Sequence, residues 1–290
     1  MILSRDNGFN IYYVISLLLL VVIPAILILI LKNKSDKTKK IVLWSLALSN
    51  FLLHFLKILH PDYQVDIEDS LRRMTAENIC ALTTIVLPFT MLSKNKTLKG
   101  YFYLIGLLGG LMAVILTTEP NNRPFYEFNS IRYYICHYIL FAVPVVSVAL
   151  KEYKPDFRSS IWMPLMFLMG QTIIMLNEFF VWGVGLYDYS WETFLSPIYR
   201  NPSFVFGPNT EFKHIADAFG FLVPEIFKTN IFGVEVAGDY FYWPVVWLII
   251  PVVLFFPLVY FLFTLPFTHK DVAEFIKNIK NKKSINIEQK

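Results

Sequence analysis

Long apolar runs alternate with short charged segments along most of the chain. Seven of these runs are long enough, or nearly so, to cross about 30 Å of hydrocarbon as helices that rise about 1.5 Å per residue. They cover approximately residues 9–31, 41–59, 77–92, 101–118, 131–150, 161–183 and 241–267. The pattern predicts an all-α fold in which residues 1–290 form a single polytopic membrane bundle of seven transmembrane helices.

Two segments lie outside these predicted spans. Residues 184–239 form the longest loop and carry many aromatic side chains, and residues 268–290 form a lysine-rich tail. Within the loop, residues 214–227 are expected to form an interfacial helix. The loop is interpreted either as a lid or lateral gate for lipid, or as an ordinary loop that rests on the lipid head groups.

The composition agrees with a membrane protein and excludes several other classes. Of the 290 residues, 56% are hydrophobic and 17% are charged, whereas soluble domains have about 45–50% apolar and about 25% charged residues. A chain of this composition is neither disordered nor collagen-like. Its two cysteines, Cys80 and Cys136, cannot supply the disulfide framework of a small secreted domain.

The distribution of charge between the predicted loops indicates an orientation. Alternate loops and the tail carry 17 of the 26 basic residues, whereas 16 of the 22 acidic residues lie on the other side. Because basic residues concentrate on the cytoplasmic side, the N-terminus is predicted to be external and the C-terminus cytoplasmic. The basic face is expected to contact anionic lipid head groups, and no motif for nucleic-acid binding is present. Its residues are Lys32, Lys34, Lys37, Lys39, Lys40, Lys94, Lys96, Lys99, Lys151, Lys154, Arg158, Lys270, Lys277, Lys280, Lys282, Lys283 and Lys290.

Four polar side chains, each on a different predicted helix, fall at similar depths in the outer third of the bilayer. Cys80 lies about one turn inside its helix and His137 nearly two turns inside. His54 and Asn177 lie about one and a half turns from the outer ends of their helices, and Asn50 lies one turn deeper than His54. A polar layer shared by four helices is typical of an intramembrane functional site.

A thiol and an imidazole at one depth suggest a nucleophile and its base. His137 would take the proton of Cys80 and leave a thiolate, which is the competent nucleophile. A position near a helix N-terminus, which Thr75 is expected to cap, favours the thiolate, whereas burial opposes its charge. Asn177 or His54 would orient the imidazole, as the third member does in other catalytic triads. An ester or thioester carbonyl at membrane depth is the expected target.

Structural interpretations of the same residues remain open. Cys80 would then be a small buried hydrophobe, and the histidines and asparagines would form hydrogen bonds between helices. The protein would be a non-enzymatic transporter or a ligand-binding membrane protein. Lys57 is expected to extend towards the interface, and Cys136 to face lipid or to pack. Cys80, His54 and His137 lack the spacing of a metal site, so neither a metal nor a soluble cofactor is expected.

Two short motifs and their separation carry a family resemblance. The first is the stretch Glu77-Asn78-Ile79-Cys80-Ala81-Leu82, which precedes Thr83 and Pro88, and the second is Tyr133-Tyr134-Ile135-Cys136-His137. With Asn177 and the closing segment 260–267, they resemble the YwaF-like integral membrane proteins, the bacterial branch of the transmembrane protein 164 family of acyltransferases. That family usually has Pro, Leu and His just before the cysteine, where this chain has the run Ala76, Glu77, Asn78 and Ile79. The nearest match to its Asn-Tyr-aromatic segment is Asn201-Pro202-Ser203-Phe204.

The resemblance implies a cysteine-dependent acyl transfer between membrane glycerolipids in a bacterial plasma membrane. An acyl-thioester would form on Cys80 from a phospholipid, and a lysophospholipid hydroxyl would accept the acyl group. His137 would serve first as base and then as acid. With water as the acceptor, the same site would be a lipase.

Overall fold

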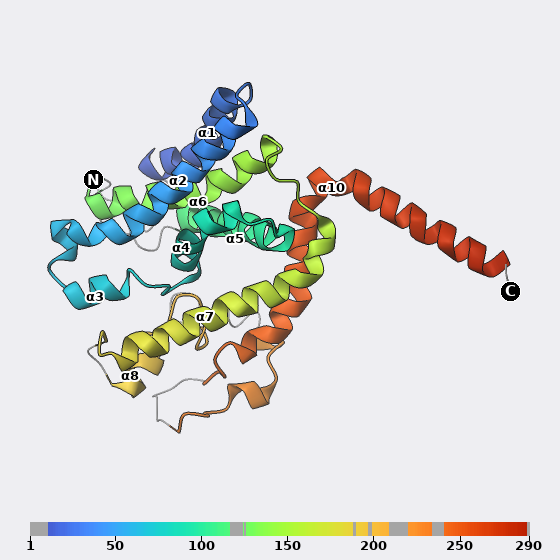
Figure 1. Ribbon diagram of the computed structural model, residues 1–290. Coiled ribbons are helices and arrows are strands. Elements are labelled where there is room, and N and C mark those ends of the chain that lie inside the picture. Colours follow the sequence, from blue (N-terminus) through green and yellow to red (C-terminus); the bar gives the residue numbers. More distant parts are fainter. Residues whose placement is uncertain are drawn as a thin grey trace.

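Helices make up nearly all of the regular structure, as the apolar pattern predicts (Figure 1). The computed structural model describes residues 11–116, 124, 126–187, 190–196, 199–208, 220–233 and 241–288, with only the backbone at 280 and 282–288. The α-helices are α1 (Ile11–Leu31), α2 (Asp36–Leu56), α3 (Ile67–Arg72), α4 (Ile79–Leu92), α5 (Lys96–Leu116), α6 (Phe128–Ala149), α7 (Met163–Gly183), α8 (Trp191–Leu195) and α10 (Ile249–Glu288). Short 3-10 helices cover Lys57–Leu59, Pro61–Tyr63, Phe157–Trp162, Glu225–Lys228 and Val246–Leu248.

Six of the described helices are long and apolar enough to cross a membrane: those that contain α1, α2, α5, α6, α7 and α10. The remaining predicted span, residues 77–92, corresponds to α4, which has 14 residues and extends only about 21 Å. The protein is therefore an all-helical polytopic membrane bundle of six candidate spans and one shorter apolar helix. Its predicted orientation across the membrane stays a prediction.

Capping residues explain where the helices depart from the predicted ranges. Helix α2 begins before the apolar run because the side chain of Ser35 accepts a hydrogen bond from the Thr38 backbone N–H. Helix α4 begins at Ile79 because Asn78 caps it, accepting from the Ala81 N–H. Asn78 thus takes the capping role expected for Thr75. Short polar side chains at these two positions decide which residue is the first of each helix.

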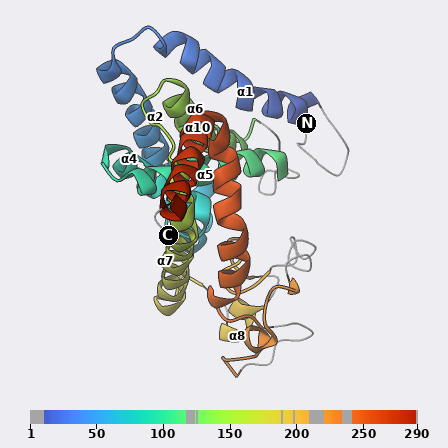
Figure 2. The ribbon, with the colours of Figure 1, turned by 90° about the vertical axis from the view of Figure 1, so that its right-hand side faces the viewer.

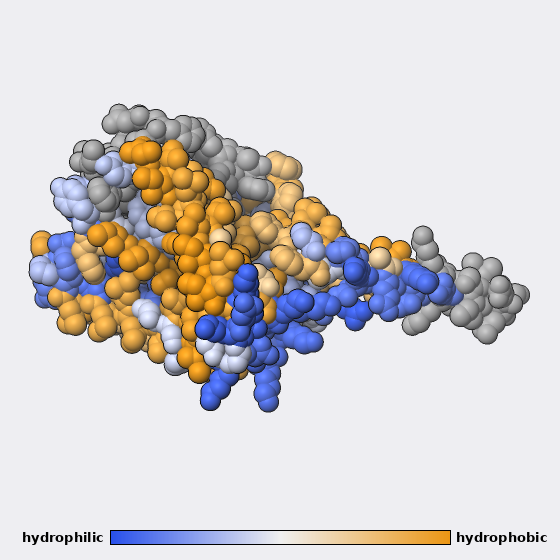
Figure 3. All heavy atoms as spheres, turned by 90° about the horizontal axis from the view of Figure 1, so that it is seen from above, coloured by the Kyte–Doolittle hydropathy of each residue, from blue (hydrophilic) through white to orange (hydrophobic). Residues whose placement is uncertain are grey.

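Helix α5 lies in the middle of the bundle, where it packs against α6 and α4. Helix α1 packs against α6 on one side of the bundle and α10 packs against α7 on the other (Figures 1 and 2). Between them, Leu104, Leu140 and Tyr260 belong to one buried cluster. Apolar side chains cover much of the outside of the bundle (Figure 3), as expected for a surface that faces lipid.

Close contact between α5 and α6 depends on two glycines. A Cβ atom on Gly106 would lie 2.7 Å from the Leu140 carbonyl oxygen, and one on Gly110 would lie 2.7 Å from the His137 carbonyl oxygen. The Gly-x-x-x-Gly spacing on α5 therefore serves helix packing within the bundle.

Helix α10 continues well beyond the predicted span. It contains Pro257 and Pro266, and its C-terminal half leaves the bundle (Figure 1). The predicted basic tail is thus helical as far as Glu288. An ion pair of 2.7 Å between Lys154 and Asp271 and the ring of Phe275, 5.5 Å from the Arg158 guanidinium, connect it to the loop before α7.

The described parts of the long loop fold back onto α4 and α7. Phe194, Leu195 and Val205 share a buried cluster with Leu82 of α4 and Ile174 of α7. Of the interfacial helix predicted at 214–227, residues 214–219 lie outside the described part of the chain. The remainder contains a turn followed by the 3-10 helix Glu225–Lys228.

Candidate functional site

A cavity of about 490 Å³ opens at the end of the bundle where α3 and the long loop meet α4, α5 and α6. Cys80, His137, His54 and Cys136 line it, so the structure brings the predicted thiol and imidazole to one cavity. Asn50 and Asn177 do not line it. Among the described residues, no cluster of three His, Cys, Asp or Glu side chains is arranged to hold a metal ion.

Cys80 is the second residue of α4, two positions after the Asn78 cap. Its side chain is partly exposed, and it faces the cavity. The backbone N–H groups of a first helical turn carry the positive end of the helix dipole, which favours an anion beside them. This position therefore favours a thiolate at Cys80 over one in the middle of a helix.

His137 is held in one tautomer by its own helix. Its Nδ1 lies 2.8 Å from the Tyr133 carbonyl oxygen, and its ring lies 4.2 Å from the Tyr133 ring, centroid to centroid. Because a carbonyl oxygen only accepts, Nδ1 carries the hydrogen and Nε2 of the neutral ring is left with a lone pair. The imidazole thus presents a proton acceptor, oriented by a backbone carbonyl one turn earlier.

Two consecutive glycines of α5 allow close contact with α4, which carries Cys80, and with α6, which carries His137. The Cys80 Sγ lies 3.3 Å from the Cβ position of Gly109, and the His137 carbonyl oxygen lies 2.7 Å from that of Gly110. The thiol and the turn of α6 that carries the imidazole therefore pack against the same step of α5.

The two glycines allow a matched test of this arrangement. We expect Gly110→Ala to lower the free energy of unfolding by about 1–3 kcal/mol, because its methyl group would meet backbone atoms of α6. Gly109→Ala should fold normally, since its methyl group meets only the Cys80 side chain, yet it should slow labelling of that thiol. Thermal unfolding in detergent and thiol-labelling rates provide the measurements. An unchanged melting temperature for Gly110→Ala would contradict the close packing of α5 on α6.

A family comparison adds to this geometry. A family model described as the TMEM164 family matches residues 4–186. The chain belongs to the TMEM164 family. The predicted resemblance is thus confirmed at the level of the family, while the bacterial YwaF-like branch stays a prediction. No curated protein and no solved structure matches the chain.

The matched part of this TMEM164 family member spans α1 to α7 and includes Cys80, His137, His54, Asn50 and Asn177. The protein is accordingly a multi-pass integral membrane protein. Residues 187–290, which include α10, lie outside the match.

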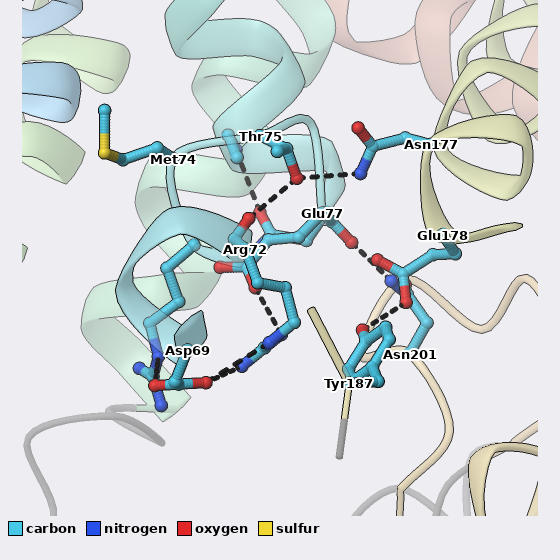
Figure 4. A network of polar contacts seen from close by, with 12 residues as sticks. Asp69, Arg72, Met74, Thr75, Glu77, Asn177, Glu178, Tyr187 and Asn201 are labelled. Atoms are coloured by element: carbon cyan, nitrogen blue, oxygen red, sulfur yellow. Dashed lines mark hydrogen bonds and ion pairs between the residues drawn. The ribbon is translucent and has the colours of Figure 1, made fainter. Parts of the chain in front are cut away.

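The predicted supporting residues hold the backbone around the pair. His54 Nε2 donates to the Met74 carbonyl oxygen at 3.0 Å, and Asn177 Nδ2 donates to the Thr75 hydroxyl at 2.8 Å (Figure 4). Both acceptors belong to the α3–α4 linker, residues 73–78. Asn50 Nδ2 donates to the Cys136 carbonyl oxygen at 3.3 Å, beside His137. These bonds position the segments that carry Cys80 and His137, and Tyr133 supplies the bond to the imidazole.

Lys57 is buried, contrary to the expectation that it reaches towards the interface. It is 4% exposed, and its Nζ donates to the Arg73 carbonyl oxygen at 2.7 Å. Lys57 and His54, three residues apart on the α2 end, therefore bind consecutive carbonyl groups of the α3–α4 linker.

The long loop holds the same linker from the other side. Asn201 Nδ2 donates to the Glu77 carbonyl oxygen, and the Ile79 backbone N–H donates to the Ser203 hydroxyl at 2.8 Å. Ser203 also lines the cavity. The sequence indicated this segment only through the weak match of Asn201-Pro202-Ser203-Phe204, because nothing local in those residues reveals a partner more than a hundred positions away.

Arg72 forms the centre of a polar network outside the spans (Figure 4). It bonds Glu77 at 2.7 Å and also bonds Asp69, and its guanidinium lies 5.3 Å from the Tyr187 ring. Burial alone would lower the pKa of Arg72, but Glu77, Tyr187 and Asp69 raise it, so the guanidinium stays charged. The Tyr187 hydroxyl donates to the buried Glu178 carboxylate at 2.7 Å, which connects this network to α7.

Cys136 does not face lipid. It is 7% exposed and lines the cavity together with Cys80. It lies more than two turns inside α6, so its thiol lacks the first-turn amides that surround Cys80. The two cysteines therefore share a cavity but differ in the electrostatic environment of their sulfur atoms.

Proposed function

We propose that this protein is an integral membrane acyltransferase that moves acyl chains between glycerophospholipids through a thioester on Cys80. The observation that carries the proposal is the position of Cys80, at the N-terminus of α4, in one cavity with a histidine whose Nδ1 is held by the Tyr133 carbonyl oxygen. A thiol and a base in this arrangement are typical of cysteine nucleophiles.

The first half-reaction loads the enzyme. His137 Nε2 takes the proton of the Cys80 thiol, and the thiolate attacks the carbonyl carbon of a phospholipid ester. As the tetrahedral intermediate collapses, the bond between that carbon and the glycerol oxygen breaks. The imidazolium gives its proton to the departing alkoxide, which leaves as a lysophospholipid hydroxyl. The acyl group stays on Cys80 as a thioester.

The second half-reaction transfers the acyl group from Cys80 to an acceptor lipid. His137 Nε2 removes the proton from the hydroxyl of an acceptor lysophospholipid, whose oxygen attacks the thioester carbonyl. The carbon–sulfur bond breaks and leaves the Cys80 thiolate, which regains its proton from the imidazolium. The cycle needs no soluble cofactor, and with water as the acceptor it becomes lipid hydrolysis.

The lining of the cavity supports a lipid as the substrate. Met112, Ala113 and Leu116 of α5 and Leu140 of α6 offer apolar surface beside Cys80. The predicted orientation would place this end of the bundle in the outer leaflet, at the depth of glycerolipid esters. Pro202 and Ser203 of the long loop line the cavity, and the loop would serve as a lid or lateral gate.

Trapping the acyl-enzyme tests the proposal. After incubation with a diacyl phospholipid, the purified protein should gain the mass of one acyl chain on the tryptic or chemical fragment that contains Cys80. Neutral hydroxylamine should remove that mass, because it cleaves thioesters readily and oxygen esters slowly. The absence of any hydroxylamine-sensitive acyl group, with a range of phospholipid and neutral donors, would contradict the proposed function in favour of a ligand-binding membrane protein.

A further inference from the structure

Positive charge is concentrated on the wall of the cavity that contains Cys80. Among the described residues, the wall carries four cations, Lys57, Arg72, Arg73 and Arg132, and a single carboxylate, Glu77. Lys57 is 4% exposed and Arg132 is 8% exposed. Holding charge in so little water is costly unless anionic or polar groups compensate it. Arg72 and Arg73 form ion pairs with Asp69 and Glu77, so Lys57 and Arg132 are the two buried cations that this wall offers to an anionic ligand.

Two of these cations meet at one place. The Lys57 Nζ lies 5.8 Å from the centre of the Tyr63 ring, and the Arg132 guanidinium carbon lies 5.7 Å from the same ring. His54 lines the same cavity as these two cations. Tyr63 is itself buried. The 3-10 helix that follows α2 and the first turns of α6 thus bring a lysine and an arginine within 6 Å of the centre of one aromatic ring.

The place of Arg132 along α6 relates this pair of cations to His137. Both residues line the cavity, and Arg132 precedes His137 by five residues. At about 1.5 Å per residue, it lies roughly 7.5 Å closer to the helix N-terminus, the predicted outer end. In a glycerophospholipid, the phosphate likewise lies outward of the ester carbonyls, separated from them by the glycerol backbone. A lipid with its phosphate at Arg132 would therefore place an ester at the depth of the Cys80–His137 pair.

We propose that Lys57 and Arg132 form a subsite for the phosphate of a glycerophospholipid, and that this subsite positions the ester next to Cys80. The proposal rests on the proposed acyl transfer for its consequence and adds the selection of the donor. Arginine and lysine bind phosphate oxygens through charge-assisted hydrogen bonds. A diacylglycerol with the same acyl chains lacks that phosphate, so it would bind weakly and present its esters without fixed depth.

Binding measured without catalysis keeps the test independent of the acyl-transfer reaction. In a Cys80→Ala background in detergent micelles, native mass spectrometry would compare retention of a diacyl phospholipid with that of a diacylglycerol of identical chains. We expect the phospholipid to be preferred by about ten- to a hundredfold, the range for charge-assisted hydrogen bonds. Adding Arg132→Gln or Lys57→Gln should reduce that preference to about twofold or less, and Arg132→Lys should restore part of it.

A buried arginine elsewhere provides the matched control. Arg200 is 3% exposed and donates to the carbonyl oxygens of Leu195 and Pro208, away from the cavity wall. Arg200→Gln should lower the melting temperature but leave the preference for phospholipid unchanged. A preference that survives in both Arg132→Gln and Lys57→Gln would overturn the subsite, as would an equal loss in Arg200→Gln.

Two further comparisons separate the possible sources of phosphate and the two proposals. Inorganic phosphate at millimolar concentration should not displace the lipid; if it does, the subsite belongs to free phosphate and the lipid assignment is overturned. In the Cys80-containing protein, acyl-enzyme formation with phospholipid and diacylglycerol should show the same preference as binding. A preference for phospholipid in binding without any acyl-enzyme would overturn the proposed reaction but support the subsite. An acyl-enzyme that forms equally from phospholipid and diacylglycerol would support the proposed reaction but overturn the subsite.

Discussion

Replacing Cys80 by alanine is expected to remove acyl-enzyme formation completely and to lower turnover by roughly a thousandfold or more, the usual cost of losing a covalent nucleophile. The fold should survive the change. Cys80 is only partly buried and its removal leaves the Asn78 cap intact, so the cost in stability should be below about 1 kcal/mol. Turnover of labelled phospholipid, expressed per folded molecule, is the measurement that checks it.

Cys136→Ala is the matched control for this variant. It removes the second cysteine of the same cavity, which lies deep inside α6 and away from a helix N-terminus. It should keep most of the wild-type rate and the full acyl-enzyme signal. A normal rate per folded molecule for Cys80→Ala would end the acyl-transfer proposal, and the cavity would then be a binding pocket in which Cys80 is only a packing residue.

Replacing His137 by asparagine is expected to slow thioester formation by about a hundred- to ten-thousandfold near neutral pH, the range typical of a general base. Asparagine is chosen because its amide N–H can replace Nδ1 as donor to the Tyr133 carbonyl oxygen, while it has no basic nitrogen. The variant therefore removes the base and keeps the local hydrogen bond of α6. Rapid-quench measurement of acyl-enzyme formation provides the rate.

The pH dependence of this variant has a definite sign. Without the imidazole, only thiolate formed by spontaneous ionisation can react, and an ordinary thiol ionises at about pH 8.5. The rate of His137→Asn should therefore rise about tenfold per pH unit from neutrality and level off above that pH. The deficit relative to wild type should be largest at neutral pH and should shrink at high pH. A constant deficit across this range would show that His137 acts through structure and not as a base.

His54→Asn serves as the control for the pH profile. It weakens the bond from α2 to the Met74 carbonyl oxygen, which positions the α3–α4 linker and through it Cys80. Its rate should fall by a smaller factor than that of His137→Asn, and the shape of its pH profile should match the wild type. A profile shaped like that of His137→Asn would instead make His54 the base.

Local sequence signals predicted the helices well because each helix is decided by nearby residues. Apolar runs of sufficient length must satisfy their backbone groups internally in lipid, so they form helices whatever surrounds them. Ser35 and Asn78 then choose the first residue through bonds to N–H groups three positions later. The C-terminal half of α10 was missed as a helix because it is polar, and its contacts with Lys154 and Arg158 come from a distant loop.

The rise per residue predicted that Cys80, His54 and His137 lie at similar heights, because it fixes the distance of each residue from the end of its own helix. All three residues line one cavity in the structure. The sequence did not predict the hydrogen-bond partners of these polar residues. Asn177 or His54 was expected to orient the imidazole, yet Asn177 bonds Thr75 and His54 bonds the Met74 carbonyl oxygen. The bond to the His137 ring comes from the Tyr133 carbonyl oxygen. Height is set by distance along one helix, whereas a hydrogen-bond partner depends on the rotation of each helix about its axis.

The sequence by itself determined that this protein is a helical membrane bundle of the TMEM164 family, and it predicted a thiol and an imidazole at one depth. Only the tertiary structure decided that Gly109 and Gly110 let α5 approach the helices of the thiol and the imidazole, and that Asn201 and Ser203 hold the start of α4. It also decided that Lys57 and Arg132 both lie within 6 Å of the centre of the Tyr63 ring. The reason is physical: helix formation and span length follow from local bonding and hydropathy, while these contacts depend on close packing between segments far apart in the chain, which no local pattern encodes.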